Sequence, residues 1–329
     1  MSKQKELTRI GDVPLLKRMV RDFAPTPARL KLVEAAAEIM ERPDAAEAAF
    51  LARQLVQCTL PHSDPGNVEA WQRRSGNLTL VIQRGWDDEK ETPIGYPYGC
   101  LPRLLLFWVT TEAVRTKQRR LELGRSLAAF MRQVGLNPDT GTGKRSDARR
   151  LKNQMTRLFA SRISFRQTLE DGDRQGKRYL NMDVAPKGEY WWDVRRPEQG
   201  TLWESWIELG EEFYAAITTA PVPFDVRALR MLKRSPLALD LYAWACYRVF
   251  SIVQRNEPPK FMAWEMLMRQ LGTDYADVKN FKKHAAAALR KVKLAYPALE
   301  ITPAKGGFTI HAKRLAMPAR PPVQKLGNS

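Results

Sequence analysis

The order of helical and strand-like segments repeats along this chain of 329 residues, and this repeat limits the possible folds more than any other feature. In each copy, a long apolar helix precedes a shorter helix, a third helix with one basic side, and two β-like segments joined by a turn. The copies occupy about 102–185 and about 235–312. Helix, turn, helix and β-hairpin in that order is the winged-helix arrangement, so the pattern predicts two such domains in tandem.

The third helix of the first copy is the segment "DARRLKNQMTRLFASRI" at 147–163. Ser146 or Asp147 can cap its start. Its apolar residues form one stripe, made of Leu151, Met155, Leu158 and Phe159. The other face is left with Arg149, Arg150, Asn153, Thr156 and Arg157. The segment "DGDRQG" at 171–176 then joins two β-like segments and has the glycines of a hairpin turn.

The third helix of the second copy is predicted over 275–294. One side carries Val278, Phe281, Ala285, Leu289 and Val292. The other side carries Lys279, Asn280, Lys282, Lys283, Arg290 and Lys293. A hairpin follows with Lys305 at its tip. The long helix that opens this copy begins with Ser235-Pro236, an N-cap followed by proline at the first helical position.

Nearly all of the formal net charge of +18 comes from these two copies. Residues 101–160 hold 13 Lys and Arg against 4 Asp and Glu, and residues 275–320 hold 10 against 2. The segments 1–100 and 161–274 are balanced. A uniformly basic protein would spread its surplus, whereas two basic segments indicate two surfaces that bind a polyanion.

The stretch "TGTGKRS" at 140–146 resembles a phosphate-binding loop but fails its spacing. That motif requires glycine at 138 and Ser or Thr at 145, where this chain has Pro138 and Arg145. The motif also follows a buried strand, yet residues 126–134 have helical periodicity. We therefore interpret the stretch as the connector between two helices.

Several classes of protein are disfavoured by what the sequence lacks. No window of 18 uncharged apolar residues exists and the N-terminus is charged throughout, so we expect neither a transmembrane helix nor a signal peptide. Three widely spaced cysteines favour a reduced, cytoplasmic protein without a metal site. His62, His284 and His311 include no His-x-His pair of the kind that holds a metal in rolling-circle nickases. We expect no catalytic residues and no cofactor.

These patterns predict an α+β, mainly α-helical fold of two tandem winged-helix domains with an N-terminal helical extension. The predicted divisions are a helical region at 1–94, domains at 95–198 and 199–316, and a flexible tail at 317–329. The N-terminal region either packs on the first domain or serves in dimerisation or partner docking, and its composition favours neither. The Trp-rich segment 190–206 is expected to pack in the core or between domains.

Two long phrases carry a resemblance to a known family. The segments "GYPYGCLPRLLLFWVTTEAVRTKQRRLELGRSLAAFMRQVGL" at 95–136 and "KRSPLALDLYAWACYR" at 233–248 are similar to the plasmid-encoded RepA-type replication initiators. The similarity extends over about 90–315. It implies tandem winged-helix domains that bind iterons, which are short direct repeats at a plasmid origin. It also implies a balance between monomer and homodimer and the recruitment of host replication proteins.

The sequence thus predicts a non-enzymatic, sequence-specific protein that binds double-stranded DNA and initiates plasmid replication. A winged-helix transcriptional regulator is the alternative, and an origin-nicking relaxase or nuclease is less favoured. The predicted DNA contacts lie on basic helix faces, on the connector and at the hairpin tips. They are Lys144, Arg145, Arg149, Arg150, Asn153, Thr156, Arg157, Arg174, Lys279, Asn280, Lys282, Lys283, Arg290 and Lys305.

Overall fold

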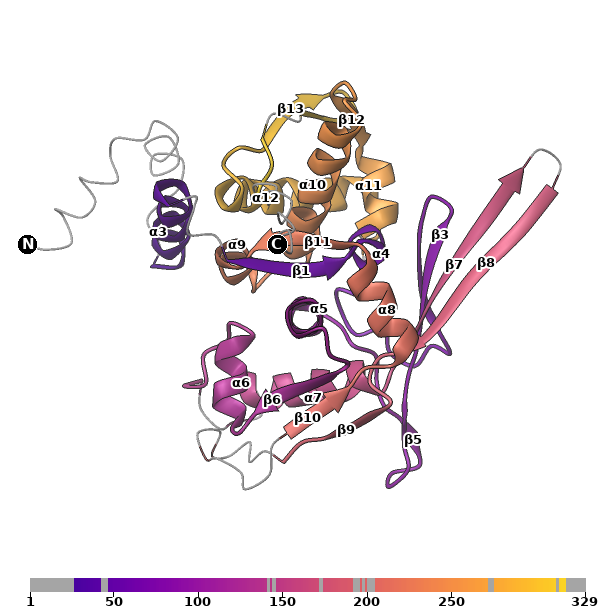
Figure 1. Ribbon diagram of the computed structural model, residues 1–329. Coiled ribbons are helices and arrows are strands. Elements are labelled where there is room, and N and C mark those ends of the chain that lie inside the picture. The colour runs from indigo at the N-terminus through magenta and orange to yellow at the C-terminus, as the bar shows by residue number, and fades with distance from the viewer. Residues whose placement is uncertain are drawn as a thin grey trace, which may run out of the picture.

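The computed structural model describes residues 27–42, 47–140, 143, 146–171, 174–191, 196, 199, 205–271, 275–311 and 314–317. These residues form an α+β fold in which helices hold more residues than strands. Figure 1 shows two bodies, one above the other, with a two-strand ribbon between them and a long hairpin projecting to one side. We call residues 100–183 the first unit and residues 236–311 the second unit.

The first unit contains the helices and the hairpin predicted for it. Its elements are, in order, α5 (Cys100–Thr116), β6 (Arg120–Gly124), α6 (Leu127–Gln133), α7 (Asp147–Phe159), β7 (Arg162–Asp171) and β8 (Arg174–Asp183). The predicted apolar stripe of α7 is confirmed, because Leu151, Met155, Leu158 and Phe159 are all buried. The strand β6 was not anticipated from the sequence.

The second unit repeats this order of elements. They are α10 (Pro236–Gln254), β12 (Lys260–Ala263), α11 (Trp264–Leu271), α12 (Val278–Ala295), β13 (Glu300–Ala304) and β14 (Gly307–His311). Its core includes a ring cluster in which Phe308 packs edge-on against Trp244, with centroids 6.0 Å apart, and lies tilted against Trp264 at 5.0 Å. The predicted order of three helices and a hairpin is confirmed, but the strand β12 was not anticipated, because its residues were expected to begin the second helix.

The two units differ in how their strands pair. In the second unit, β12 joins the β13–β14 hairpin in a sheet of order β12-β14-β13. In the first unit, β6 lies instead in the sheet β6-β10-β9, which uses β9 (Lys187–Glu189) and β10 (Ser205–Glu208). The β7–β8 hairpin joins β2 (Trp71–Ser75) and β3 (Leu78–Gln83) in the order β2-β3-β7-β8. This second sheet extends into the projecting hairpin of Figure 1.

Side-chain caps fix the start of α7, α10 and α12. The Ser146 hydroxyl accepts a hydrogen bond from the Arg149 N–H at 3.4 Å, so it is Ser146 that caps α7. Ser235 caps α10 through the Ala238 N–H, and Asp277 caps α12 through the Asn280 N–H at 2.7 Å. Each cap satisfies a backbone donor that the helix itself leaves unpaired.

Further segments lie outside the two units. They include α3 (Pro27–Glu41), β1 (Ala48–Ala52), α4 (Arg53–Gln57), β4 (Trp86–Asp87), β5 (Thr92–Pro93), α8 (Glu211–Thr219), β11 (Pro221–Asp225) and α9 (Val226–Leu232). The strands β1 and β11 pair as an antiparallel ribbon. Phe224 of β11 packs edge-on against Phe107 of α5 at 5.2 Å and lies 5.9 Å from Tyr242 of α10. The buried apolar residues form one cluster from Ile39 to Ile310.

The prediction that residues 1–94 are helical is wrong for part of the region. Residues 48–52, 71–75 and 78–83 form β1, β2 and β3. The alanine-rich segment at 48–52 becomes a strand because β11, more than 160 residues later, pairs with it from Ala48↔Asp225 to Ala52↔Pro221. Likewise β3 pairs with β7 along its whole length. Distant partners override local helix propensity at these positions.

Candidate nucleic-acid interface

The helix α12 presents an uninterrupted basic face. Its inward side buries Phe281, Ala285, Ala288, Leu289 and Val292. Its exposed residues include the predicted contacts Lys279, Asn280, Lys282, Lys283 and Arg290. The sequence prediction of which α12 side chains face outward is therefore confirmed for these residues.

The cations of α12 lack acidic partners among the residues that the structure describes. The helix holds six Lys and Arg and no Asp or Glu. Within the part of the chain that the structure describes, Lys279, Lys282, Lys283 and Arg290 form no ion pair. Lys305 is also exposed, in the two-residue turn between β13 and β14 where Gly306 has a φ of +77°. These groups are free to neutralise phosphates.

The cations of helix α7 are less available for phosphate binding than those of α12. Arg150 is exposed, but its guanidinium pairs with Asp147 at 3.2 Å. Asn153 is exposed, and Arg149 is half-buried with its Nε lacking a hydrogen-bond partner among the described residues. Cations that already have a partner contribute less to phosphate binding, because the pair must be broken or shared.

Two predicted contacts on α7 are engaged with the protein. The Arg157 side chain is only 18% exposed; it pairs with Asp64 at 2.9 Å and donates to the Tyr96 carbonyl at 3.1 Å. The Thr156 hydroxyl donates to the Lys152 carbonyl and lies 3.3 Å from the Tyr190 hydroxyl. The expectation that both lie on the open face of α7 is not met, because Asp64 and Tyr96 engage Arg157 and Tyr190 lies against Thr156.

The connector and the first hairpin carry the remaining predicted contacts. Lys144 and Arg145 lie outside the described residues. Arg174 is exposed at the start of β8, where it is paired in register with Asp171. The connector runs from Val134 to Ser146 between α6 and α7, as predicted, and Asp147 N–H donates to the Thr140 hydroxyl at 3.1 Å. A helix, and not a strand, precedes it, which contradicts a phosphate-binding loop.

A buried polar network that the sequence did not suggest joins the two units. Arg103 of α5 donates to both carboxylate oxygens of Asp240 of α10 at 2.8 Å. The same guanidinium donates to the carbonyls of Leu60, Pro61 and Gly99, and His62 Nε2 lies 2.8 Å from the Asp240 carboxylate. Charge and hydrogen-bond satisfaction are therefore complete at this junction.

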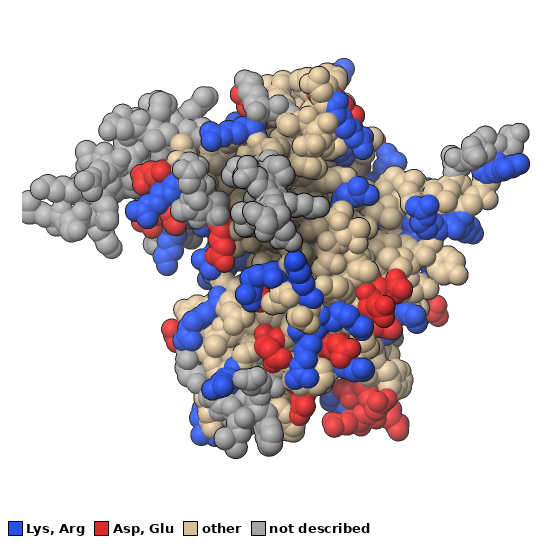
Figure 2. Space-filling model, viewed as in Figure 1, with Lys and Arg blue, Asp and Glu red and all other residues tan. Residues whose placement is uncertain are grey.

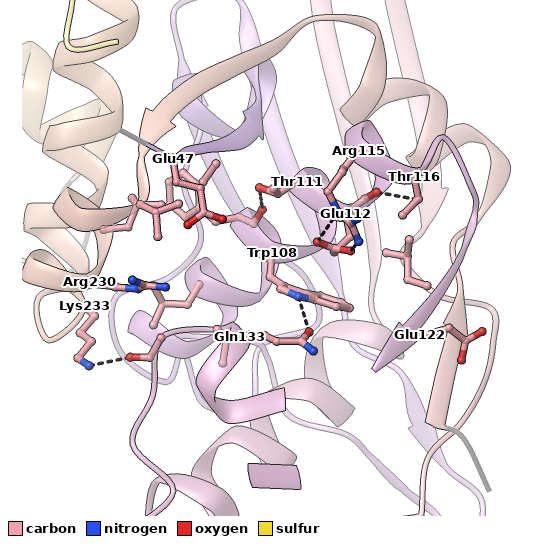
Figure 3. A pocket seen from close by; sticks show the side chains of 18 of the residues that line it. Glu47, Trp108, Thr111, Glu112, Arg115, Thr116, Glu122, Gln133, Arg230 and Lys233 are labelled. Atoms are coloured by element: carbon pink, nitrogen blue, oxygen red, sulfur yellow. Dashed lines mark hydrogen bonds and ion pairs between the residues drawn. The ribbon is translucent and has the colours of Figure 1, made fainter. Parts of the chain in front are cut away.

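A cleft of about 580 Å³ lies between the first unit and α9 (Figure 3). Its floor is apolar and includes Phe107 and Trp108, whose indole N–H donates to Gln133 at 3.1 Å. Its charged residues are of both signs, namely Glu47, Glu112, Arg115, Arg120, Glu122, Arg230 and Lys233. Arg115 pairs with Glu112, and Lys233 donates to the Gly135 carbonyl at 2.6 Å. Because acidic and basic side chains are mixed here and several pair with one another, the cleft does not have the charge of a polyanion-binding surface.

Two further observations concern the described residues alone. Among them, no three His, Cys, Asp or Glu side chains are grouped so that they could hold a metal ion. Within the same residues, none of the helices has the length and apolar character needed to cross a membrane.

Comparisons with known proteins give both structural and family matches. A crystal structure of domains 2 and 3 of RctB, as selenomethionine derivatives, is 12% identical with a TM-score of 0.47, and covers 79% of this chain and 96% of that one. A second crystal structure of RctB domains 2–3 is 11% identical with a TM-score of 0.39, and covers 78% of this chain and 94% of that one. No curated protein matches the chain.

The family comparison covers more than half of the chain. The model described as "Plasmid encoded RepA protein" matches residues 96–266. This range begins just before α5 and extends through α10 into α11, so it includes the second phrase and all but the first residue of the first phrase. The chain belongs to the family of plasmid-encoded RepA proteins.

Proposed function

We propose that this protein binds double-stranded DNA in a sequence-specific manner and initiates plasmid replication from direct repeats at an origin. Membership in the RepA family supports the replication role. The observation that carries DNA binding is the exposed face of α12, a helix that contains six Lys and Arg and no acidic residue. A basic helix face on a rigid apolar support is the electrostatic footprint of a duplex-binding element.

Each unit is proposed to be a winged helix. In the second unit, support comes from the order helix, strand, helix, helix and hairpin, and from the pairing of β12 with the hairpin strand β14. In the first unit the order of elements is the same, but β6 pairs with β10. The proposal for the first unit therefore rests on its helices and on the β7–β8 hairpin alone.

The second unit supplies most of the duplex affinity in this proposal. The helix α12 enters the major groove, where Asn280 reads an adenine and Lys279, Lys282, Lys283 and Arg290 hold phosphates or base edges. The helix α7 contributes through Arg149, Arg150 and Asn153, while Arg157 and Thr156 keep α7 in place. Lys305 and Arg174 bring the two hairpins against the DNA backbone.

Fluorescence anisotropy with an origin duplex tests the proposal. The double variant Lys282→Gln/Lys283→Gln should bind more weakly than wild type, with a salt slope reduced by about 1 for each phosphate that is no longer neutralised. Wild type making on the order of 6–10 phosphate contacts should lose about 10³–10⁵ in affinity between about 50 and 200 mM salt. The matched control Lys90→Gln/Lys187→Gln removes the same charge from other exposed positions and should bind normally. A flat salt response of wild type would rule out the proposal.

Replication itself is tested in cells. A plasmid that carries the origin should be maintained only when this protein is supplied, whereas a transcriptional regulator would change expression without supporting replication. The proposal includes no enzymatic activity, catalytic residue or cofactor. Incubation of supercoiled origin DNA with the protein and magnesium should therefore leave the DNA intact, and a nicked product would identify a relaxase or nuclease instead.

The proposed assembly is a cytoplasmic monomer in balance with a homodimer, with one monomer on each repeat. Two DNA-binding units on one chain can contact successive major-groove segments about 10.5 bp apart without a palindrome. Recruitment of host replication proteins follows from family membership in this proposal. Light scattering over a concentration series, with and without one repeat, should give one chain per repeat; a stable dimer on a single asymmetric repeat would contradict it.

A further inference from the structure

A row of four residues crosses the distal end of the sheet β2-β3-β7-β8. The strands pair in register as Arg74↔Thr79, Thr79↔Arg166 and Arg166↔Tyr179. Side chains that lie opposite one another in a sheet point to the same side. The row therefore presents two arginines and a tyrosine on one face. Lys177, two residues before Tyr179 and opposite Thr168, adds a cation to the same face.

The other face of this sheet holds it in the core. The neighbouring row contains Leu80, Phe165 and Leu180, of which Leu80 and Phe165 are buried and Leu180 packs against the core. The sheet is thus anchored from one side, and the face with the arginines is not needed for packing at its distal end.

The aromatic member of the row is unusually exposed. Tyr179 is 71% exposed, more than any other large apolar side chain in the described residues. Arg74, Arg166 and Lys177 are exposed beside it. Within the described part of the chain, neither Arg166 nor Lys177 has an ion-pair partner, and Arg74 donates only to the Gly76 carbonyl at 3.0 Å. Figure 2 shows Lys and Arg along this projecting arm.

We propose that this face binds a segment of single-stranded DNA, with Tyr179 stacked on an unpaired base. Directly opposite side chains on neighbouring strands are about 5 Å apart, so Arg166 lies where it can hold the phosphate next to that base. Arg74 is two strands away from Arg166, roughly 10 Å. Lys177 lies two residues nearer the β7–β8 turn than Tyr179, on the same face. Aromatic rings beside cations are the combination by which proteins bind single strands without strong sequence preference.

The geometry favours a single strand over the alternatives. In a duplex the faces of the bases are covered by their neighbours, so a tyrosine on a broad sheet face would meet only the backbone. Addition of a strand from another protein is disfavoured, since the edge strand β8 carries Arg174, Lys177 and Arg178. The proposal does not depend on the duplex role of α12, which lies in the other unit. Arg174 at the tip of the same hairpin is proposed to contact duplex DNA, but Tyr179, Arg166 and Arg74 are not.

The test is an anisotropy titration of the full chain with a labelled oligothymidine of about 12 nucleotides, within the usual site range. Tyr179→Val keeps strand propensity but removes the ring, and should weaken binding by roughly 5- to 150-fold, the usual range for loss of one stacked base. Tyr179→Phe should bind like wild type, because the ring and not the hydroxyl makes the contact. Arg166→Gln should weaken binding and reduce its salt dependence.

Two controls separate this site from the proposed duplex site. Arg178→Gln removes a charge next to Tyr179 in sequence but on the opposite face, and should leave oligothymidine binding unchanged. Origin duplex binding should be unaffected by Tyr179→Val and reduced by Lys282→Gln/Lys283→Gln. The proposal is overturned if wild type does not bind the oligonucleotide, if folded Tyr179→Val binds it as well as wild type, or if Tyr179→Val loses duplex and single-strand binding in parallel.

Discussion

Asp240 accepts hydrogen bonds from Arg103 and is hydrogen-bonded to His62 in the buried junction between the two units. Burial alone would raise the pKa of Asp240, but the charge of Arg103 and the two side-chain hydrogen bonds hold that pKa well below its usual range. Burial lowers the pKa of His62 below its ordinary value, and the hydrogen bond to Asp240 opposes this only in part. The folded protein therefore favours a neutral His62 imidazole next to an ionised Asp240 carboxylate.

The sign of the resulting pH dependence follows from His62. Since its folded-state pKa is below the unfolded value of about 6.5, the unfolded chain takes up the proton first as the pH falls. The contribution of neutral His62 to the free energy of unfolding is complete above about pH 6.5. It is lost below that pH, by at most about 1.4 kcal/mol per pH unit. Urea denaturation of His62→Gln from about pH 7 to about pH 5 should show a shallower loss than wild type. Equal slopes would show that His62 does not titrate in this way.

Arg157 should behave as a structural residue. Its pair with Asp64 and its bond to the Tyr96 carbonyl are charge-assisted, and the side chain is mostly shielded from solvent. Arg157→Gln should lower the free energy of unfolding by about 1–3 kcal/mol. Arg150→Gln, on the same helix but in an exposed pair, should cost less than about 1 kcal/mol. Chemical denaturation of both variants measures the difference, and equal costs would place Arg157 on the open face after all.

Sequence periodicity correctly predicted which residues are exposed where a helix has a clear apolar stripe. The exposure of Lys282 and Lys283 follows from the burial of Phe281 and Ala285 on the same helix. Periodicity could not predict that Arg157 is covered, because its partner Asp64 is 93 positions away in the chain. The Arg103–Asp240 pair, 137 positions apart, was unpredictable for the same reason.

Among the elements, α3 is attached to the rest of the protein by one side chain in particular. Arg227 of α9 donates to the Arg42 carbonyl at 2.8 Å and to the Glu38 carbonyl at 3.4 Å, which caps the end of α3. The same guanidinium is held by Asp225, the N-cap of α9, at 2.7 Å. Unpaired carbonyls at a helix end favour a nearby cation, so this contact orients α3 as well as binding it.

Loss of that contact should release α3 alone. In Arg227→Gln, amide hydrogen exchange should quicken over residues 27–41, while α5 and α10 keep their protection, because local opening of an edge element need not unfold the core. Arg230→Gln changes an exposed residue of the same helix and is the control. Unchanged exchange in α3 would mean that its apolar side, which includes Ala36 and Ile39, is enough to hold it.

Helices and strands were predictable where the segment's own residues determine its structure. The helices α7, α10 and α12 follow from their own side-chain N-caps and apolar residues, whereas α5 starts after Gly99 without a side-chain cap. The short strands β1 and β6 do not follow from their own residues. The strand β1 forms because β11, about 170 residues later, pairs with it, and β6 forms because β10, about 85 residues later, pairs with it. Strand propensity depends on such neighbours more than helix propensity does.

At the scale of the whole molecule, the two units share one core. The ring of Phe224 contacts Phe107 from the first unit and lies near Tyr242 from the second. The strand β10, which the sequence assigned to the second domain, lies in a sheet with β6 of the first unit. The division at residue 199 stays a prediction, but the continuous core has a consequence for unfolding that two independent domains would not have.

The expected consequence is a single unfolding transition for the described core. Hydrogen exchange in α5 and α10 should report the same free energy of opening, because neither helix can expose its inner side without breaking the junction at Phe224. Phe224→Ala should destabilise by about 3–5 kcal/mol, the usual cost of removing a buried ring, and should lower the protection of both helices together. Phe261→Ala, which removes a ring that is 52% exposed on β12, is the matched control and should leave both helices unchanged. If Phe224→Ala lowers protection in only one of the two helices, the units fold independently and the shared core does not couple them.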